Sequence, residues 1–459
     1  MQYTDLIFVF AFLPITVIAS LFDRSAEYKN MILIISSVIF FTWGRPAIIL
    51  LLFLTAVMDY LFGLGAASDK KLLKFVSLFL DFVMNTGTFV VFSWNSLFRS
   101  GGIFDRFEFF SFADKLIPIG IAFYTLRGMS YVFDVFHGRI KPEKNPFCIL
   151  TYMLSYHFMM VGPVVRYGEI SDGIRNRTVG ASEINDGITR FIIGLGKAAV
   201  VAPAFGKLMT AGLDFSRLTF VGAWLGMAGF LGNVYWMFDG YTDMALGLGL
   251  MNGFKYPENI LPFRFKGLVT GIVTGFNATL CRFFRLNTIC RSKGKFVYSL
   301  TVLFSAGCIG LWYGLKKGTV CGALFFGVTV ILERAFLARF FKNKPPLLGD
   351  VYTIIITLFG ASVFYFDSYW KFRNWIMTCI GVKSAEFTYS ALTSVLKENW
   401  IVLAFGLLAF MPPVKKAVKK LCEKLSKTDG GYGAVRIAKT VCILGVLMIY
   451  TVEAYNLVK

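Results

Sequence analysis

Charge is scarce in this sequence of 459 residues. Only 16% of the residues are Asp, Glu, Lys or Arg, whereas 56% are hydrophobic and the mean hydropathy is +0.65. Soluble domains carry about 25% charged residues, and a chain this apolar could not cover its surface with polar groups. The composition therefore excludes a soluble enzyme, a disordered protein and a nucleic-acid-binding domain, despite a net charge of +20. We expect a polytopic membrane protein.

Residues that often carry chemistry are also few. There are only two histidines, His137 and His157. The eight cysteines stand singly and none forms a Cys-x-x-Cys pair, so the sequence predicts buried thiols and gives no support for disulfides or a metal site. No basic segment precedes the first apolar run and no small-residue cleavage site follows it. We therefore interpret residues 5–22 as a first membrane span, not as a removable signal.

Long apolar runs fill the chain. Crossing the hydrocarbon core takes about 20 apolar residues. Candidate spans lie near 5–22, 31–43, 46–64, 72–94, 116–136, 147–165, 188–211, 219–250, 267–281, 296–314, 318–338, 350–367, 397–412 and 436–453. Gly and Pro interrupt several runs, so we predict an all-α protein with roughly 11–14 membrane-spanning or re-entrant helices. The runs are too long for membrane strands and lack their alternation.

Lysine and arginine gather in three segments between these runs: residues 282–295, 334–344 and 415–427. Glu423 is the only acidic residue in the three, so the positive-inside rule predicts that all of them face the cytoplasm. In the stretch 412–425, lysines would occupy one face of a helix and Val414, Val418, Leu421 and Leu425 the other. That pattern fits a helix lying on an anionic leaflet, and it equally fits an ordinary loop that sets the topology.

Several charged residues stand inside or beside the apolar runs: Arg127, Asp134, Arg166, Asp239, Asp243 and Glu333. An unpaired charge is expensive there, so these side chains should pair, face the bundle interior or line a wet cavity. Asp239 and Asp243 are one helical turn apart and would share a face. Pairing with an arginine or with helix N-terminal amides is the favoured interpretation. A divalent ion or a proton relay is the alternative.

The segment 235–259 is the most specific motif. Its stretch Phe238-Asp239-Gly240-Tyr241-Thr242-Asp243, continued to Pro257 and Asn259, resembles a block of the bacterial membrane-bound O-acyltransferases. The resemblance is to the alginate O-acetylation branch, with the teichoic-acid D-alanylation proteins as a more distant group. Further blocks match in order: Phe40–Gly44, Ile117–Phe123, Ser130–Val135, Val161–Tyr167 (which contains Pro163 and Arg166) and Ala454–Asn456.

This resemblance implies a ring of membrane helices around a thin centre, where a cytoplasmic acyl donor and an extracytoplasmic acceptor reach one point. We divide the single membrane domain, residues 1–459, into peripheral N-terminal helices (1–112), a core with the motifs (113–340) and C-terminal helices (341–459) with a basic cytoplasmic loop at 413–428. The residues implied to line the substrate tunnel or to form its motifs are Trp312, Asp239, Tyr241, Asp243, Pro163, Arg166 and Asp134. No metal or bound cofactor is implied, and acyl-CoA or an acyl-carrier-linked group is the expected donor.

The family's catalytic histidine is missing. It stands in a Gly-Leu-Trp-His-Gly motif, whereas this sequence has Gly310-Leu311-Trp312-Tyr313-Gly314. A neutral imidazole suits a base that deprotonates an acceptor hydroxyl, but a tyrosine, with a pKa of about 10, stays protonated at pH 7. Asn277 occupies the second family position, without the flanking tryptophans and arginines. His157 is a candidate surrogate base or a hydrogen-bonded core residue, and His137 is interpreted as a solvated loop residue.

Three functions follow from these features. The first is an O-acyltransferase that passes an acetyl-like group toward an extracytoplasmic polysaccharide in the bacterial cell envelope, as a multi-pass protein of the cytoplasmic (inner) membrane. Its partners would be the lipid bilayer, an extracytoplasmic acyltransferase or a cytoplasmic acyl carrier protein, and no nucleic acid. The second is a catalytically degenerate homologue, a pseudoenzyme that serves as scaffold or acyl conduit. The third is a transporter of a small or lipid-linked substrate.

Overall fold

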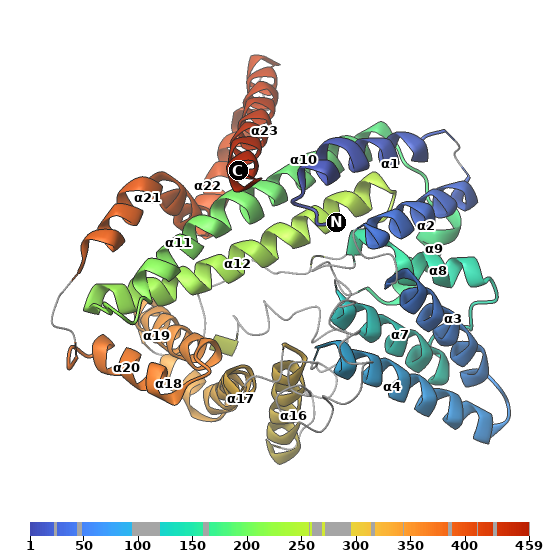
Figure 1. The fold of residues 1–459 in the computed structure, drawn as a ribbon, viewed down its shortest axis with the longest axis horizontal. Helices are drawn as coiled ribbons and strands as arrows, with labels where there is room; N and C mark the ends of the chain where they lie inside the picture. The colour runs from blue at the N-terminus through green and yellow to red at the C-terminus, as the bar shows by residue number, and fades with distance from the viewer. Residues whose placement is uncertain are drawn as a thin grey trace. The chain divides into compact units, whose positions relative to one another are not determined.

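The computed structural model describes residues 1–22, 25–43, 48–93, 120–158, 165–256, 258, 269–270, 295–313, 317–342, 344–383, 388–410, 412–425 and 429–458. These residues form helices, turns and loops and contain no strand (Figure 1). The chain divides into two compact units, which are described separately. Unit 1 comprises residues 1–191 and 241–259, and unit 2 comprises residues 192–240 and 260–459.

Seven helices in the described part of the chain are long and apolar enough to cross a membrane. They are Ile49–Ala66, Lys71–Val91, Ala181–Gly212, Lys317–Leu337, Leu348–Tyr365, Ser390–Ala409 and Gly433–Tyr455. Each holds at least 18 residues, which is close to the length that the hydrocarbon core requires. The protein is therefore an all-α polytopic membrane protein, as its composition predicts.

Unit 1 contains the N-terminal helices. In chain order they are η1 (Phe8–Phe12), α1 (Leu13–Ser20), α2 (Ala26–Thr42), α3 (Ile48–Ala66), α4 (Lys71–Ser93), α7 (Ile121–Phe136), α8 (Pro146–Leu154), η2 (Tyr156–Phe158) and α9 (Tyr167–Asn176), followed by most of α10 (Ala181–Gly196). Local signals set several boundaries. Ser25 caps α2 by accepting from the backbone amide of Tyr28, and Asn145 caps α8 by accepting from that of Phe147.

Aromatic side chains form the centre of unit 1. Phe8, Phe12 and Phe40 are buried, and their rings lie 5.3–6.1 Å apart between centroids. Tyr156 packs edge-on against Phe12 at 5.4 Å, and the Tyr3 hydroxyl donates to the Tyr156 carbonyl. Such contacts add to the free energy of burial and fix ring orientation. They hold the short helix η2, and hence the residue after Tyr156, in one position.

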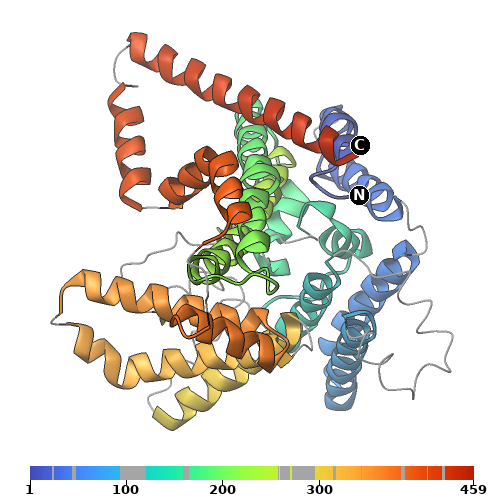
Figure 2. The ribbon, with the colours of Figure 1, turned by 60° about the vertical axis from the view of Figure 1, so that its left-hand side comes forward.

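Unit 2 contains the remaining helices. They are η3 (Lys197–Val201), α11 (Ala202–Gly212), the first part of α12 (Phe220–Met251), α16 (Lys295–Tyr313), α17 (Lys317–Leu332), η4 (Glu333–Leu337), α18 (Ala338–Lys342), α19 (Pro346–Tyr365), α20 (Tyr369–Cys379), α21 (Ser390–Phe410), α22 (Pro412–Leu425) and α23 (Asp429–Val458). Helices α16, α17 and α19 pack in sequence against one another (Figure 2).

Two hydrophobic clusters stabilise unit 2. The first joins α11, α12 and α21 and includes Phe205, Trp236 and Leu403. The second joins α12, α19 and α20, where the Trp375 indole donates to the Ala223 carbonyl at 2.9 Å. Elsewhere α23 leaves many apolar side chains exposed, as expected for a helix that faces lipid.

Two predicted spans differ from the observed helices. The helix expected over 147–165 ends at Leu154, because Ser155 has an extended ψ of 117°; with nine residues it reaches only about 14 Å. Conversely, the run expected over 188–211 is part of one helix over 181–212. Pro203 interrupts the α-helical hydrogen bonds there, and the π-helical segment η3 directly before it accommodates the missing N–H.

Candidate functional site

Two of the motif blocks are joined by an ion pair in unit 1. Asp134, at the end of α7, is 4% exposed and accepts from Arg139 Nη1 at 2.9 Å and Arg166 Nη1 at 3.3 Å. Arg166 also begins α9, where its backbone amide donates to the Glu169 carboxylate at 3.0 Å. The carboxylate predicted to need a partner thus has two cations. The ion pair between Asp134 and Arg166 therefore holds the start of α9 against the end of α7.

Beside this pair lies a second buried carboxylate, Glu143, which the sequence analysis did not single out. It accepts from the Tyr167 hydroxyl, from Arg175 and from the Asn145 amide, and its own amide donates to Tyr131 at 3.0 Å. Burial alone would raise the pKa of Glu143, but these donors outweigh it and the pKa lies below the ordinary value of 4.5. Glu143 is therefore ionised and fixes the turn between α7 and α8.

Arg127 is buried inside unit 1. It is 1% exposed, and its guanidinium donates to the carbonyls of Tyr152 and Met153 at 3.1 Å each. These carbonyls belong to the last turn of α8, where no intrahelical donor is available. A cation at a helix C-terminus also interacts favourably with the helix dipole. Arg127 thus caps the helix that leads to His157.

His157 lies at the centre of an aromatic stack. It is fully buried, its Nε2 hydrogen-bonds the Tyr256 hydroxyl, and its ring stacks on Phe254 and Tyr256 at 5.4 and 5.6 Å. Arg177 lies over the Phe254 ring at 4.5 Å, and burial lowers the pKa of Arg177 to about 10, so it stays protonated at neutral pH. This packing favours the interpretation of His157 as a hydrogen-bonded core residue. An acceptor hydroxyl could reach the imidazole only by displacing Phe254 or Tyr256. His137, in contrast, is exposed, as predicted.

A turn at the end of α12 brings the residues that follow it against His157. Gly253 adopts a left-handed φ of 81°, and the Phe254 amide donates to the Gly249 carbonyl at 2.8 Å. This is a Schellman motif, in which a glycine satisfies the last carbonyls of the helix. It directs Phe254 and Tyr256 onto His157. The glycine in the Met-Asn-Gly-Phe part of the motif therefore has a conformational reason.

The two aspartates of the motif are paired along α12. In unit 2, Lys197 Nζ donates to Asp239 at 2.7 Å. In unit 1, Arg190 donates to Asp243 at 3.0 Å and also contacts Glu258 at 2.7 Å. The favoured pairing of Asp243 with an arginine is observed, whereas the partner of Asp239 is a lysine. The ring of Tyr241, which lies between them in the sequence, is 6.1 Å from that of Tyr3.

Glu333 anchors a further segment in unit 2. It is 1% exposed, and its carboxylate accepts from the amides of Val269 and Thr270 at 2.8 Å each and from the Thr270 hydroxyl at 2.5 Å. Three donors satisfy a buried carboxylate as an ion pair would. The predicted need of Glu333 for partners is thus met mainly by backbone amides.

A pair of aspartates in the apolar helices of unit 1 escaped the sequence analysis. Asp59 on α3 and Asp81 on α4 are 0% and 1% exposed, and Asn85 Nδ2 donates to both carboxyl groups at 2.9 and 3.1 Å. Two like charges cannot both be kept in such a site, so one carboxyl group must hold a proton. Single acidic residues inside apolar runs were the signal that could have revealed them.

The predicted catalytic position is not placed by the structure. Asn277 and Pro163 lie outside the described residues, and Trp312 and Tyr313 end helix α16 with side chains that also lie outside them. Their roles stay predictions. In the described part of the chain, no group of three His, Cys, Asp or Glu side chains could hold a metal ion. The five cysteines described there have free thiols. Cys148 and Cys379 are buried as predicted, whereas Cys308, Cys321 and Cys442 are exposed, so the prediction of buried thiols is wrong for these three.

Comparisons with known proteins find sequence similarity over most of the chain. A scan against protein-family models finds no match. Among curated proteins, a probable alginate O-acetylase of Pseudomonas aeruginosa is 27% identical over 428 residues, covering 89% of this chain and 81% of that protein. A peptidoglycan O-acetyltransferase of Helicobacter pylori is 24% identical over 390 residues, covering 76% and 73%. A teichoic acid D-alanyltransferase of Bacillus subtilis is 23% identical over 256 residues, covering 52% and 64%.

Proposed function

Because this chain belongs to the membrane-bound O-acyltransferase family, in its alginate O-acetylase-like branch, we propose that it transfers an acetyl-like group across the membrane for the O-acetylation of an extracytoplasmic polysaccharide. The observation that carries the proposal is the alignment with the probable alginate O-acetylase over 89% of the chain. The D-alanyltransferase aligns with only 52% of it, which favours acetyl over D-alanyl as the group transferred. The bacterial cytoplasmic membrane is the proposed location.

The donor and partners follow from the direction of transfer. A thioester such as acyl-CoA or an acyl carrier protein would approach from the cytoplasm, where the basic segments 282–295 and 334–344 would attract its negative charge. An acceptor hydroxyl oxygen then bonds to the acyl carbon while the carbon–sulfur bond breaks. The hydroxyl proton passes to a base and the thiolate leaves. An extracytoplasmic acyltransferase is the proposed receiving partner.

A second candidate, a catalytically degenerate scaffold or conduit, is favoured by one specific observation. Tyr313 stands in place of the family histidine, and the stretch around Asn277 lacks the family's arginines. Loss of a general base typically lowers a rate by about 10²–10⁴, so positioning within the helical ring could still support slow transfer. The two candidates therefore differ in whether the chain transfers the group on its own.

Gene deletion tests the proposal and separates the candidates. We expect ester-linked acetate on the envelope polysaccharide to fall on deletion and to return with a plasmid copy of the wild-type gene. Unchanged acetate after deletion would contradict the proposed function. If the gene restores acetate only in a strain that also holds another member of the family, the chain is a scaffold. The matched control is expression of the other member alone.

A further inference from the structure

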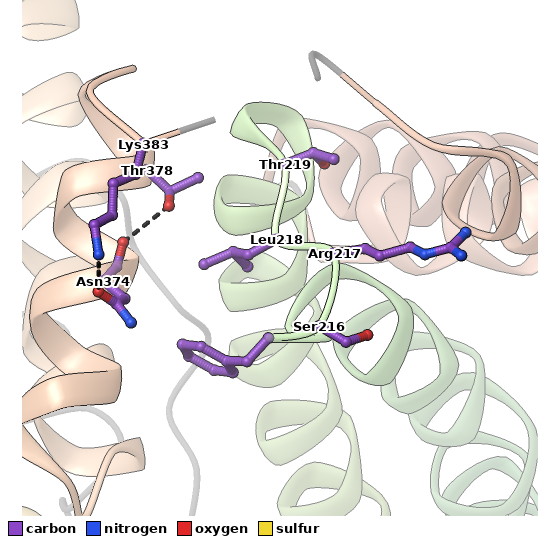
Figure 3. Close-up of a pocket in the computed structure, with 8 residues that line it drawn as sticks. Ser216, Arg217, Leu218, Thr219, Asn374, Thr378 and Lys383 are labelled. Carbon is purple, nitrogen blue, oxygen red and sulfur yellow. Dashed lines mark hydrogen bonds between the residues drawn. The ribbon is translucent and has the colours of Figure 1, made fainter. Parts of the chain in front are cut away.

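A pocket of about 610 Å³ opens in unit 2 between the α11–α12 connection and α20 (Figure 3). Small-molecule sites typically enclose about 300–1,000 Å³, so the pocket is large enough for a ligand. Its lining residues are Phe215, Ser216, Arg217, Leu218, Thr219, Asn374, Thr378 and Lys383. Nothing in the proposed acyl transfer uses these residues.

The two walls of the pocket are fixed by buried contacts behind it. The Trp375 indole donates to the Ala223 carbonyl at 2.9 Å, and the Trp224 indole donates to the Cys379 carbonyl at 3.3 Å. Each indole reaches from one wall to the backbone of the other. Trp375 is 2% exposed, so its bond is shielded from solvent, whereas Trp224 is half-buried. The opening is therefore a built feature of the fold.

One wall is polar and carries hydrogen-bond donors. Lys383 Nζ donates to the Asn374 side-chain oxygen at 2.8 Å, and the Thr378 hydroxyl donates to the Asn374 carbonyl at 2.9 Å. The Asn374 Nδ2 donor has no acceptor in the described part of the chain. The ammonium of Lys383 uses one of its three protons in the contact with Asn374. A ligand oxygen at this wall would find donors that protein groups leave unused.

The lining has a positive charge and no negative one. Arg217 and Lys383 are its charged residues, and no acidic side chain is among them. Nearby, Lys371 Nζ lies 5.8 Å from the centre of the Phe215 ring. The closest carboxylate in sequence, Asp214, accepts from the Ser216 amide and hydroxyl at 2.9 and 2.7 Å. Among the lining residues, the charge that faces Asn374 and Thr378 is the ammonium of Lys383, which favours an anionic ligand.

The opposite wall, residues 215–219, presents Leu218 toward Thr378 and Asn374, whereas Arg217 points away from α20 (Figure 3). The pocket also lies directly beyond the ends of membrane spans. Candidate spans end at Gly212 and Tyr365, and the pocket is built from the residues that follow them. At the start of α20, Tyr369 and Trp370 are 79% and 60% exposed. Exposed Tyr and Trp at span ends are typical of the membrane–water interface, the level of the lipid headgroups.

The flanking charges place the pocket at one leaflet. The basic segment 334–344 precedes the span of α19, and the lysine-rich helix α22 follows the span of α21. Both basic segments are predicted to be cytoplasmic, so residues 366–389 between the two spans face the other side. The pocket would then lie in the extracytoplasmic leaflet.

We propose that this pocket binds the phosphate headgroup of an anionic phospholipid of the extracytoplasmic leaflet. The phosphate oxygens would accept hydrogen bonds from Lys383 and Asn374. Hydrogen bonds from an ammonium to a phosphate are charge-assisted and therefore strong. The glycerol and first acyl carbons would lie against Leu218 and Phe215. A lipid held in this way would join α20 to the α11–α12 connection.

Native mass spectrometry of the purified full chain tests this, with dioleoyl phosphatidylglycerol and dioleoyl phosphatidylcholine as probes. We expect phosphatidylglycerol to be retained at low lipid concentration and phosphatidylcholine to require about tenfold more, which corresponds to about 1.4 kcal/mol. Lys383→Glu should raise the phosphatidylglycerol requirement by at least about tenfold, since it replaces the ammonium with a repelling charge. Equal retention of both lipids by the wild type would overturn the proposal.

The matched control is Lys397→Glu, which makes the same change at an exposed lysine on α21 outside the pocket. It should leave retention within about twofold of the wild type. A second arm adds soluble glycerol phosphate, which carries the same anion without acyl chains. If it displaces phosphatidylglycerol at equal concentration, the site binds free phosphate and the lipid assignment is wrong. Equal loss of retention in both lysine variants would also overturn it.

Discussion

At the residue scale, buried carboxylates of this protein are held by charged or hydrogen-bonding partners. Asp134, Asp243 and Glu333 lie within or beside apolar runs, and each is paired or accepts hydrogen bonds. Glu143 stands in a polar loop and is held by Tyr167 and Arg175 of α9. Its burial therefore depends on the contact between this loop and α9.

The network at Glu143 predicts an acid-sensitive contribution to stability. Its pKa is lowered in the folded state, so the stabilisation is present above the unfolded pKa of 4.5 and is lost as the pH falls through the folded value. Glu143→Gln should lower the free energy of unfolding by about 1.5–3 kcal/mol at neutral pH. Denaturation monitored from pH 7 to 3 should show a smaller pH dependence in the variant. The exposed Asp172→Asn on α9 is the control and should change stability by less than about 0.5 kcal/mol.

A second prediction at this scale concerns Tyr313. A tyrosine is a poor proton acceptor at pH 7, so Tyr313→His should raise the rate of acetyl transfer by up to about 10²-fold if the surrounding site is otherwise intact. Tyr313→Phe, which removes only the hydroxyl, should leave the wild-type rate. Transfer of radiolabelled acetyl measures both. A large loss in Tyr313→Phe would instead assign the hydroxyl a direct role.

At the scale of elements, hydrophobicity predicted most helices, but not their packing. Runs such as 219–250 and 350–367 correspond closely to α12 and α19. Gly240 and Gly247 of the motif, in contrast, are explained by the neighbouring helix. A Cβ on Gly247 would lie 2.6 Å from the Gly187 carbonyl oxygen of α10, and one on Gly240 would lie 2.7 Å from the Gly194 carbonyl oxygen. Small residues allow two membrane helices to approach closely.

This close approach predicts a strong effect of adding one methyl group. Gly247→Ala should destabilise unit 1 by about 1–3 kcal/mol, because the backbone of α10 would have to move. Gly445→Ala on α23 is the matched control, since a Cβ there meets nothing within 4 Å. Thermal unfolding in detergent compares the two. Equal unfolding temperatures would show that α10 and α12 do not contact through these glycines.

The aspartate pair between α3 and α4 gives another prediction for helix packing. Since one carboxyl group is already neutral, Asp81→Asn should be tolerated, with a cost below about 1 kcal/mol. Asn85→Leu removes the amide that donates to both carboxyl groups and should cost about 1–3 kcal/mol. Unfolding in detergent should rank Asn85→Leu well below Asp81→Asn. The reverse order would contradict the shared-proton arrangement.

At the scale of the whole molecule, composition indicates a helical membrane protein, and sequence similarity relates it to a probable alginate O-acetylase and a peptidoglycan O-acetyltransferase. In unit 1 an ion pair joins two of the motif blocks, and a Schellman turn ends α12. The identity of the base was not predictable. Tyr313 and Asn277 are predicted to occupy the family positions, but a base is recognised by its contacts with the acceptor, which a sequence does not contain.

Acetyl transfer by the purified chain in proteoliposomes tests directly whether this chain carries an acetyl group across the membrane. A radiolabelled acetyl thioester would be supplied on the side of the basic segments, and a hydroxyl-bearing polysaccharide acceptor, with its extracytoplasmic acyltransferase, on the other. We expect label in the polysaccharide, dependent on this chain and absent from liposomes of lipid alone. Label in the polysaccharide no higher than in the lipid-only control would contradict it.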